Sequence, residues 1–202
     1  PRTALAAPTG PMSRPFAARC ALLAELLLPY GCATVPGNAP EPPATTPAPL
    51  LTQFRLTGRL AADDGEHRFA TAFAWSHTPS RAELSLFAPT GQTLARLTLE
   101  DGDAALATAE GERHEADAAA LLEPLLGFSP PPLSALTAWI QGDPGPAPDR
   151  IERDQAGRPY RVWHSGWIVT FDSWQDDRPR RLTIERGAAR LVLLLDTWSS
   201  EP

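Results

Sequence analysis

The fold is decided by the stretch Phe54-Arg55-Leu56-Thr57-Gly58-Arg59-Leu60 and by its continuation Phe69-Ala70-Thr71-Ala72-Phe73-Ala74-Trp75. In both runs the large apolar residues recur at every second position, which is the period of a β-strand with one buried face. The intervening Asp63-Asp64-Gly65 has the composition of a tight turn. The two runs therefore predict a β-hairpin with aromatic and aliphatic side chains on one face.

The same pattern continues along the chain after this hairpin. Further alternating runs contain Leu84 and Leu86, and then Ala95, Leu97 and Leu99, and they are separated by the turn Pro89-Thr90-Gly91. The last of them ends at Glu100-Asp101-Gly102. Short strands at this spacing, with turn residues between them, favour a meander in a barrel or sandwich over alternating β-α units.

Two helices are expected in the middle of the chain. Asp117 can cap a helix that runs to Leu126 and ends at Gly127, with Pro124 keeping it short or kinked. A second helix is expected after the prolines at 130–132, with Leu133, Leu136, Trp139 and Ile140 at helical spacing and with Gly142 and Pro144 as its stop.

Strands return in the last third of the chain. The predicted segments are Tyr160–His164, Gly166–Trp174, Arg181–Arg186 and Ala189–Trp198. Helices inserted in the middle of one antiparallel sheet must cover its face or plug its mouth. The expected fold is mainly β with inserted helices: an incomplete antiparallel β-barrel, or half-barrel, closed by a helical lid around a hydrophobic cavity.

Composition removes several classes of function. The 202 residues carry a formal net charge of -6, which argues against nucleic acid as a partner. All 18 basic residues are arginine, so a lysine Schiff base and the lysine of a Walker phosphate loop are excluded. Two cysteines near the start are too few for a disulfide framework.

The amino-terminal region has the layout of a bacterial lipoprotein signal peptide. Translation is expected to start at Met12, after which Arg14 and Arg19 precede an apolar stretch over residues 20–28 and Gly31 stands directly before Cys32. We expect an upstream extension and signal peptide over 1–31, a lipid-anchored proline-rich tether over 32–50 and one folded domain over 51–202. An amphipathic helix with a buried cysteine is the alternative for the apolar stretch.

Catalysis is the first rival interpretation. A hydrolase would draw on four histidines and nearby carboxylates, namely His67, His77, His114, His164, Asp63, Asp64, Asp172 and Asp176. The sequence shows no nucleophile elbow and no metal-ligand spacing, so isolated surface histidines are the better interpretation. We expect no enzyme activity, no metal and no cofactor.

In order and spacing, these landmarks resemble the LolB family of lipoprotein-localisation proteins. The resemblance covers Phe54 to Trp198. Its marks are the opening strand, the hairpin strand ending at Trp75, Pro89 and Gly91 in the next turn, 122–127, Trp139-Ile140-Gln141-Gly142, Gly166-Trp167 and Asp196-Thr197-Trp198, behind Gly31-Cys32. It implies a half-barrel around an apolar cavity, held on the inner leaflet of the outer membrane by an amino-terminal lipid. Ala33 after the cysteine agrees with outer-membrane placement, since aspartate there would favour inner-membrane retention in such lipoproteins.

The resemblance also implies site residues. Cys32 would be acylated, and the turn Phe87, Pro89, Thr90 and Gly91 would form the membrane-insertion loop. In the family an exposed leucine precedes the glycine of this loop, whereas this chain has Thr90, which leaves Phe87 or Leu94 as the apolar tip. The expected hydrophobic cavity is lined by Phe54, Leu56, Phe73, Trp75, Leu84, Leu86, Leu122, Leu126, Trp139, Trp167 and Trp198.

The implied activity is a handover and not a reaction. A monomeric receptor would accept acylated lipoproteins from a LolA-like periplasmic carrier, shelter their acyl chains and insert them into the outer membrane. No nucleotide is needed if each site binds somewhat more tightly than the last, at about 1.4 kcal/mol for a tenfold bias. The alternative is a soluble periplasmic lipoprotein carrier or another lipid-binding half-barrel protein. Arg178, Arg180 and Arg181 could form a basic strip for the carrier, or simply a charged loop.

Overall fold

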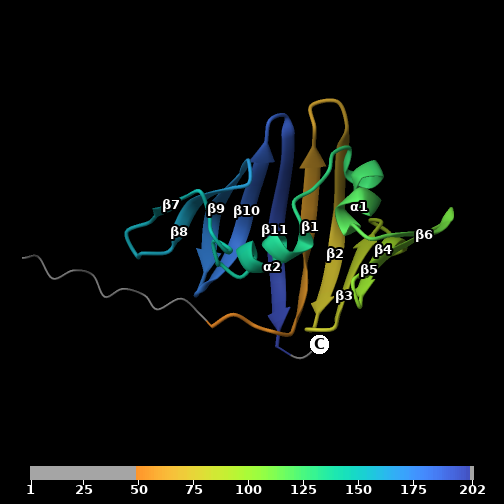
Figure 1. The fold of residues 1–202 in the computed structure, drawn as a ribbon, viewed down its shortest axis with the longest axis horizontal. Helices are drawn as coiled ribbons and strands as arrows, with labels where there is room; N and C mark the ends of the chain where they lie inside the picture. The colour runs from red at the N-terminus through yellow and green to blue at the C-terminus, as the bar shows by residue number, and fades with distance from the viewer. Residues whose placement is uncertain (1–48, 201–202) are drawn as a thin grey trace, which may run out of the picture. The chain divides into compact units, whose positions relative to one another are not determined.

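The structure is a computed structural model that describes residues 49–200 (Figure 1). The signal peptide, Cys32 and nearly all of the expected tether lie outside the described residues. Within the described range the strands are β1 (Phe54–Asp63), β2 (Arg68–His77), β3 (Arg81–Phe87), β4 (Thr93–Glu100), β5 (Asp103–Thr108), β6 (Gly111–Glu115), β7 (Arg150–Arg153), β8 (Pro159–His164), β9 (Trp167–Gln175), β10 (Arg178–Arg186) and β11 (Ala189–Ser199). The helices are α1 (Ala118–Leu126) and α2 (Leu133–Trp139).

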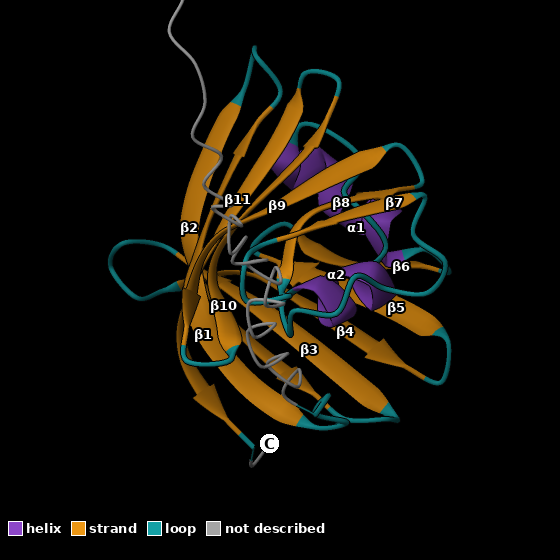
Figure 2. Ribbon diagram, turned by 90° about the vertical axis from the view of Figure 1, so that its left-hand side faces the viewer, coloured by secondary structure: helices purple, strands orange, loops and turns teal. Residues whose placement is uncertain are grey.

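All eleven of these strands form one antiparallel sheet in the order β6-β5-β4-β3-β2-β1-β11-β10-β9-β8-β7. Consecutive strands are neighbours from β1 to β6 and from β7 to β11, so the predicted meander is confirmed within each of these two runs. The first and last strands pair in the middle of the sheet, which leaves β6 and β7 as its two edges. Both helices belong to the segment that connects these two edge strands. Figure 2 shows the sheet curving around them.

The alternating pattern of β1 produces this arrangement directly. Phe54, Leu56 and Leu60 are buried, while Arg55 and Arg59 between them are exposed. An antiparallel sheet with one face covered and the other in water requires this alternation. The prediction of a mainly β fold with an open, curved antiparallel sheet and two inserted helices is confirmed.

The helix boundaries follow the capping residues seen in the sequence. The side chain of Asp117 accepts a hydrogen bond from the backbone N–H of Ala119 at 2.9 Å, as an N-cap does. Gly127 ends α1 in the left-handed conformation, with φ at 84°, and its N–H donates to the carbonyl of Glu123. Helix α2 begins directly after the prolines at 130–132. Both predicted helices are therefore confirmed.

Side-chain hydrogen bonds attach the helical segment to the sheet. The buried Gln141, just after α2, accepts from the backbone N–H of Leu51 at 2.6 Å and donates to the carbonyls of Leu51 and Thr137. Arg186 of β10 donates to the carbonyl of Ser129 between the helices at 2.9 Å. These bonds tie the chain on either side of α2 to Leu51, just before β1, and to β10.

Three strands were not predicted: β5, β6 and β7. Strand β5 is Asp-Ala-Ala-Leu-Ala-Thr, and alanine has little preference for strands. Strand β6, Gly-Glu-Arg-His-Glu, is exposed throughout, and β7 is the four-residue Arg-Ile-Glu-Arg. Short, charged strands at the edges of a sheet discourage pairing with other molecules. Such strands lack the alternation of apolar residues by which interior strands are predicted from the sequence.

Candidate functional site

A small apolar cavity lies between the helices and the curved sheet. Its volume is about 40 Å³, and residues of β1, β2, β3, β11, α1 and α2 contribute to its walls. The lining residues are all apolar: Leu60, Phe73, Trp75, Leu84, Leu122, Leu126, Pro130, Leu133, Leu136, Ile140, Leu191 and Leu193. No polar group here is left to hold a water, so the cavity suits hydrocarbon and little else.

The cavity is small for a binding site. Sites for small molecules commonly enclose about 300–1,000 Å³, well above the volume found here. A hydrocarbon chain can therefore enter only if the helical segment or its leucine side chains move away from the sheet.

The eleven side chains expected to line a cavity divide into two groups. Phe73, Trp75, Leu84, Leu122 and Leu126 line it. The remaining six lie elsewhere: Phe54, Leu56, Leu86, Trp139 and Trp167 are buried core residues, and Trp198 is half-buried at the end of β11.

Sequence reasoning missed seven of the lining residues. Leu133, Leu136 and Ile140 were recognised as one face of a helix but were not assigned to the cavity. Leu191 and Leu193 alternate inward on β11, and Leu60 does so on β1. Periodicity could have placed these six on the covered face of the sheet or helix. Only Pro130, in the connection between the helices, carried no such signal.

The aromatic residues at the lower end of β1 and β2 form a cluster around Phe54. Its ring centroid lies 5.8 Å from that of Trp75, 5.3 Å from that of Trp198 and 5.2 Å from that of His77. Trp75 meets Phe54 edge-on, and His77 stacks on it. Trp75 belongs to both the cavity wall and this cluster, so the two features are continuous.

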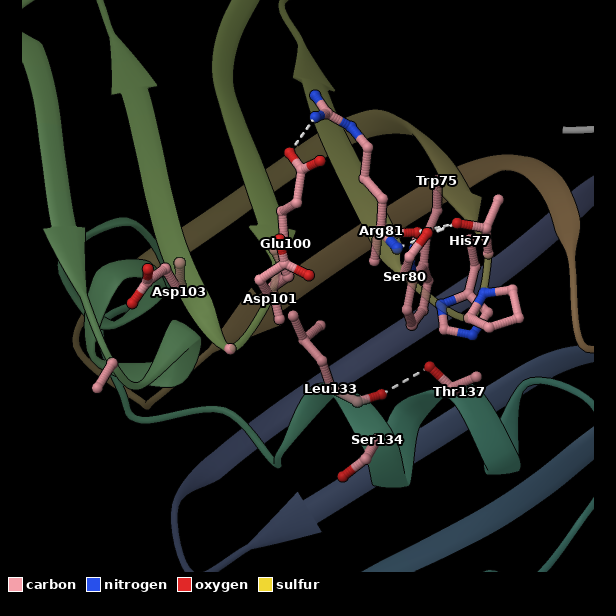
Figure 3. Close-up of a pocket in the computed structure, with 17 residues that line it drawn as sticks. Trp75, His77, Ser80, Arg81, Glu100, Asp101, Asp103, Leu133, Ser134 and Thr137 are labelled. Carbon is pink, nitrogen blue, oxygen red and sulfur yellow. Dashed lines mark hydrogen bonds and ion pairs between the residues drawn. The ribbon is translucent and has the colours of Figure 1, made fainter.

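A larger and more polar pocket of about 360 Å³ adjoins the cavity (Figure 3). The β2–β3 turn, the β4–β5 turn and the start of α2 surround it. Trp75 and Leu133 line both hollows, so the two adjoin, and we call the larger pocket the mouth of the cavity. Arg81 and Glu100 pair across its rim at 2.5 Å.

His77 stands in this mouth without a hydrogen-bond partner for its Nδ1. Burial lowers the pKa of His77 below the ordinary value of about 6.5. The unfolded chain therefore takes up a proton on this residue at a higher pH than the folded chain does. Stability should fall as the pH drops from about 6.5 towards the folded-state pKa.

We expect this loss to be visible as a lower midpoint of urea unfolding at pH 5.5 than at pH 7.5. The variant His77→Phe should show a smaller difference between the two pH values, because the group that takes up the proton is gone. His67→Gln, in the exposed β1–β2 turn, should keep the difference seen in the unchanged chain. Equal pH dependence in all three proteins would contradict the role given to His77.

The other histidines of the catalytic interpretation are dispersed. His67 contacts Asp64 at 3.4 Å in the β1–β2 turn, and His114 contacts Glu112 at 3.3 Å on edge strand β6. His164 packs edge-on against Trp139 at the end of β8. Within residues 49–200, no group of three or more histidine, cysteine or acidic residues is placed to hold a metal ion.

The expected insertion loop is the turn between β3 and β4. The N–H of Gly91 donates to the carbonyl of Ala88, and Gly91 has a φ of 86° that favours glycine. Pro89 and Thr90 are exposed, Phe87 is half-buried, and Leu94 on β4 has 40% of its surface exposed. Among the described helices, none is both long and apolar enough to cross a membrane.

The curved, open antiparallel sheet with inserted helices defines the structural class of the chain. A DUF1329 family protein from Desulfovibrio piger ATCC 29098 shares it, with a TM-score of 0.50, 9% identity and coverage of 74% of this chain and 86% of that one. A LolA superfamily protein from Nitrosomonas europaea aligns with a TM-score of 0.48 and 10% identity, over the same shares of the two chains.

Sequence comparison then identifies the family. The model of the family LolB, described as outer membrane lipoprotein LolB, matches residues 52–198. A relative from Azoarcus sp. (strain BH72), named outer-membrane lipoprotein LolB, is 35% identical over 191 residues, which are 92% of this chain and 96% of the relative. Proteins of the same name from Shewanella baltica (strain OS155) and Thiobacillus denitrificans are 33% and 31% identical, over 90% and 91% of this chain and 88% and 99% of theirs. The chain belongs to the LolB family.

This membership confirms the resemblance drawn from the sequence. The family consists of outer-membrane lipoproteins, so the outer-membrane location and the lipoprotein class expected for this chain are confirmed at that level. It is a family of lipoprotein localisation and not a family of enzymes.

Proposed function

We propose that this protein is an outer-membrane lipoprotein receptor. It accepts acylated lipoproteins from a LolA-like periplasmic carrier and passes them to the outer membrane. Cys32, which lies outside the described residues, carries the lipid that anchors it. The observation that carries the proposal is the wholly apolar cavity between the helices and the concave side of the sheet.

The chemistry of the cavity matches the problem that a lipoprotein presents. Each methylene group of an acyl chain left in water costs about 0.8 kcal/mol, so the chains must be sheltered during transfer. The aliphatic and aromatic side chains of the lining turn only apolar surface to the cavity, so no polar atom there would lose its hydration. A site of this kind recognises hydrocarbon and ignores the identity of the attached protein.

Filling the site requires the helical segment to act as a lid. Leu133, Leu136 and Ile140 face the sheet across the cavity. Gln141 attaches one end of this segment to Leu51, just before β1, and Ser129 attaches the other to β10. A swing of α2 about these attachments would separate the leucines from β2 and β11 and enlarge the cavity. Acyl chains would then replace the contacts that the leucines lose, which lowers the cost of opening.

The eleven side chains expected at the cavity remain the proposed acyl-binding set, with the five that line it in direct contact. The larger set becomes accessible when the lid opens. The turn formed by Phe87, Pro89, Thr90 and Gly91 is the proposed membrane-insertion loop. The exposed Leu94 beside it is the strongest choice for an apolar tip, because leucine gains more from lipid than threonine does.

A cavity-filling substitution tests the proposal. Leu133→Trp places a larger side chain on a half-buried residue that lines both the cavity and its mouth. We expect at least a tenfold weaker affinity for pyrene-labelled palmitate, about 1.4 kcal/mol, in fluorescence titrations of the full chain produced without its lipid. Unfolding midpoints of this protein and of the unchanged chain should remain similar.

The matched control is Tyr160→Trp, which adds the same side chain on β8 at a residue with 44% of its surface exposed. It should leave the affinity for the fatty acid unchanged. Failure of the unchanged chain to bind the fatty acid at all would refute the receptor proposal. Mass spectrometry of the membrane fraction should find an acylated Cys32; an unacylated, soluble chain would favour the alternative of a soluble carrier.

A further inference from the structure

Strands β10 and β11 separate at their lower ends and enclose a second pocket. Their pairing runs from Arg186↔Ala189 to Arg181↔Leu194 and then stops. Beyond that point, Arg178 and Pro179 pair with β9, and residues 195 and 197–199 pair with β1. The pocket between them measures about 440 Å³, and Figure 1 shows the two strands diverging there. We call the facing segments 178–180 and 195–198 the β10–β11 fork.

Irregular register on both sides opens the fork. The pairing of β1 with β11 shifts between Thr57 and Gly58, and the pairing of β10 with β9 shifts between Pro179 and Leu182. A bulge bends the strand that carries it, so two bulges at this level can turn the strands apart. Pro179 also lacks the N–H that a ladder partner would need. The fork therefore follows from the sequence of both strands.

Two buried donors at the fork have no acceptor. Arg178 stacks over the ring of Trp198, with its guanidinium carbon 5.2 Å from the ring centroid. Within the described chain, neither Nη1 of Arg178 nor Nε1 of Trp198 has a hydrogen-bond partner. Buried donors are nearly always satisfied in folded proteins. These two lie beside the pocket, so a small turn of their side chains would bring them to an acceptor there.

The charges around the fork indicate a neutral acceptor. The lining includes three carboxylates, Asp176, Asp177 and Asp196, against the two guanidinium groups of Arg178 and Arg180. Asp196 is already paired with Arg180 at 2.8 Å and with Arg59 at 3.3 Å. An anion would therefore meet no excess of positive charge, whereas a carbonyl oxygen needs none to accept from the two donors.

The fork is connected to the acyl cavity through aromatic rings. Trp198 lies 5.3 Å from Phe54, and Phe54 lies 5.8 Å from Trp75 in the cavity wall. Phe54 is fully buried between them, so a ligand that reaches from the cavity to the fork must displace these rings. The unpaired edges of β10 and β11 offer main-chain donors and acceptors with the spacing that an extended peptide matches.

We propose that the β10–β11 fork binds the extended main chain that follows the acylated cysteine of a cargo lipoprotein. Peptide carbonyls accept from Arg178 and Trp198, and the peptide backbone pairs with the free strand edges. This inference rests on the proposed receptor function, since the acyl chains must occupy the cavity. It adds recognition of peptide to recognition of hydrocarbon.

The test compares two ligands on the full chain produced without its lipid. One is dipalmitoylglyceryl cysteine with a short uncharged peptide tail, and the other is the same lipid on cysteine amide without a tail. We expect the tailed ligand to bind about tenfold more tightly. Arg178→Met removes the guanidinium donor but keeps much of the apolar bulk, and it should reduce this difference at least threefold while leaving the tail-free affinity within about twofold. Arg181→Met, exposed beside the fork, is the matched control and should retain the difference.

Two further measurements leave the fork residues unchanged and so do not depend on the variant folding. A tail with N-methylated peptide bonds should lose its advantage, because it cannot donate to the free edges. Binding of the unmodified tail should slow amide hydrogen exchange within residues 195–198. Equal affinity of the unchanged chain for tailed and tail-free ligands would overturn the inference and leave the receptor function standing. Binding of neither ligand would overturn both.

Discussion

Replacing Trp139 with alanine is expected to lower the free energy of unfolding by about 3–5 kcal/mol, the cost typical of truncating a fully buried tryptophan. Trp139 ends α2 and is completely buried. Its Nε1 donates to the carbonyl of Pro144 at 3.3 Å, and its ring meets His164 edge-on at 5.9 Å. Alanine would leave a void where α2 packs against the sheet, and the carbonyl of Pro144 would lose its hydrogen-bond donor.

Thermal and urea unfolding measure this effect. A loss of this size corresponds to a fall in Tm of roughly 6–20 °C for a domain of about 150 residues. The control Trp163→Ala removes the same kind of side chain from β8, at the residue before His164. Trp163 is half-buried, and the guanidinium carbon of Arg150 lies 4.6 Å from its ring centroid. We expect less than about 1.5 kcal/mol there. Similar losses in both variants would show that the end of α2 is not the critical packing site.

The sequence was most informative where a strand or helix has one buried side. Leu56 and Leu60 made β1 predictable, because they alternate with residues on the face of the strand that water covers. Asp117 and Gly127 made α1 predictable, because they cap the free backbone groups at its two ends. Edge strands β6 and β7 gave no comparable signal, since solubility there requires charge in place of alternation. The pairing of β1 with β11 also had no local signal, because it joins segments from opposite ends of the domain.

The site was predictable in kind but only partly in detail. Apolar periodicity identified the side chains that face inward, and that set includes Phe73, Trp75 and Leu122. Periodicity could not distinguish the residues at the cavity from core residues such as Leu56 and Trp167. That distinction depends on the distance between α2 and each strand. The fork was not predictable either, because it arises from bulges in two separate strand pairs.

The second large effect is expected at Gly58, where β1 meets β11 at a bulge. A Cβ atom on this residue would lie 2.3 Å from the carbonyl oxygen of Leu194 and 2.8 Å from Cζ of Phe73. Such contacts cannot persist, so Gly58→Ala must push β1 away from its partner strand. We expect a loss of about 3 kcal/mol in the free energy of unfolding, at the upper end of the usual cost of overpacking.

A double variant separates the two contacts. If the ring were the main obstacle, Phe73→Leu would make room and restore much of the stability lost in Gly58→Ala. We expect no such rescue, because the closer contact is with the backbone carbonyl of Leu194, which a side-chain change does not move. Thr57→Ala, exposed on the other side of the same bulge, should change stability by less than about 0.5 kcal/mol in urea unfolding. These results would show that glycine is needed at this position because the two central strands, β1 and β11, approach each other closely. The bulge between these strands also bounds the β10–β11 fork.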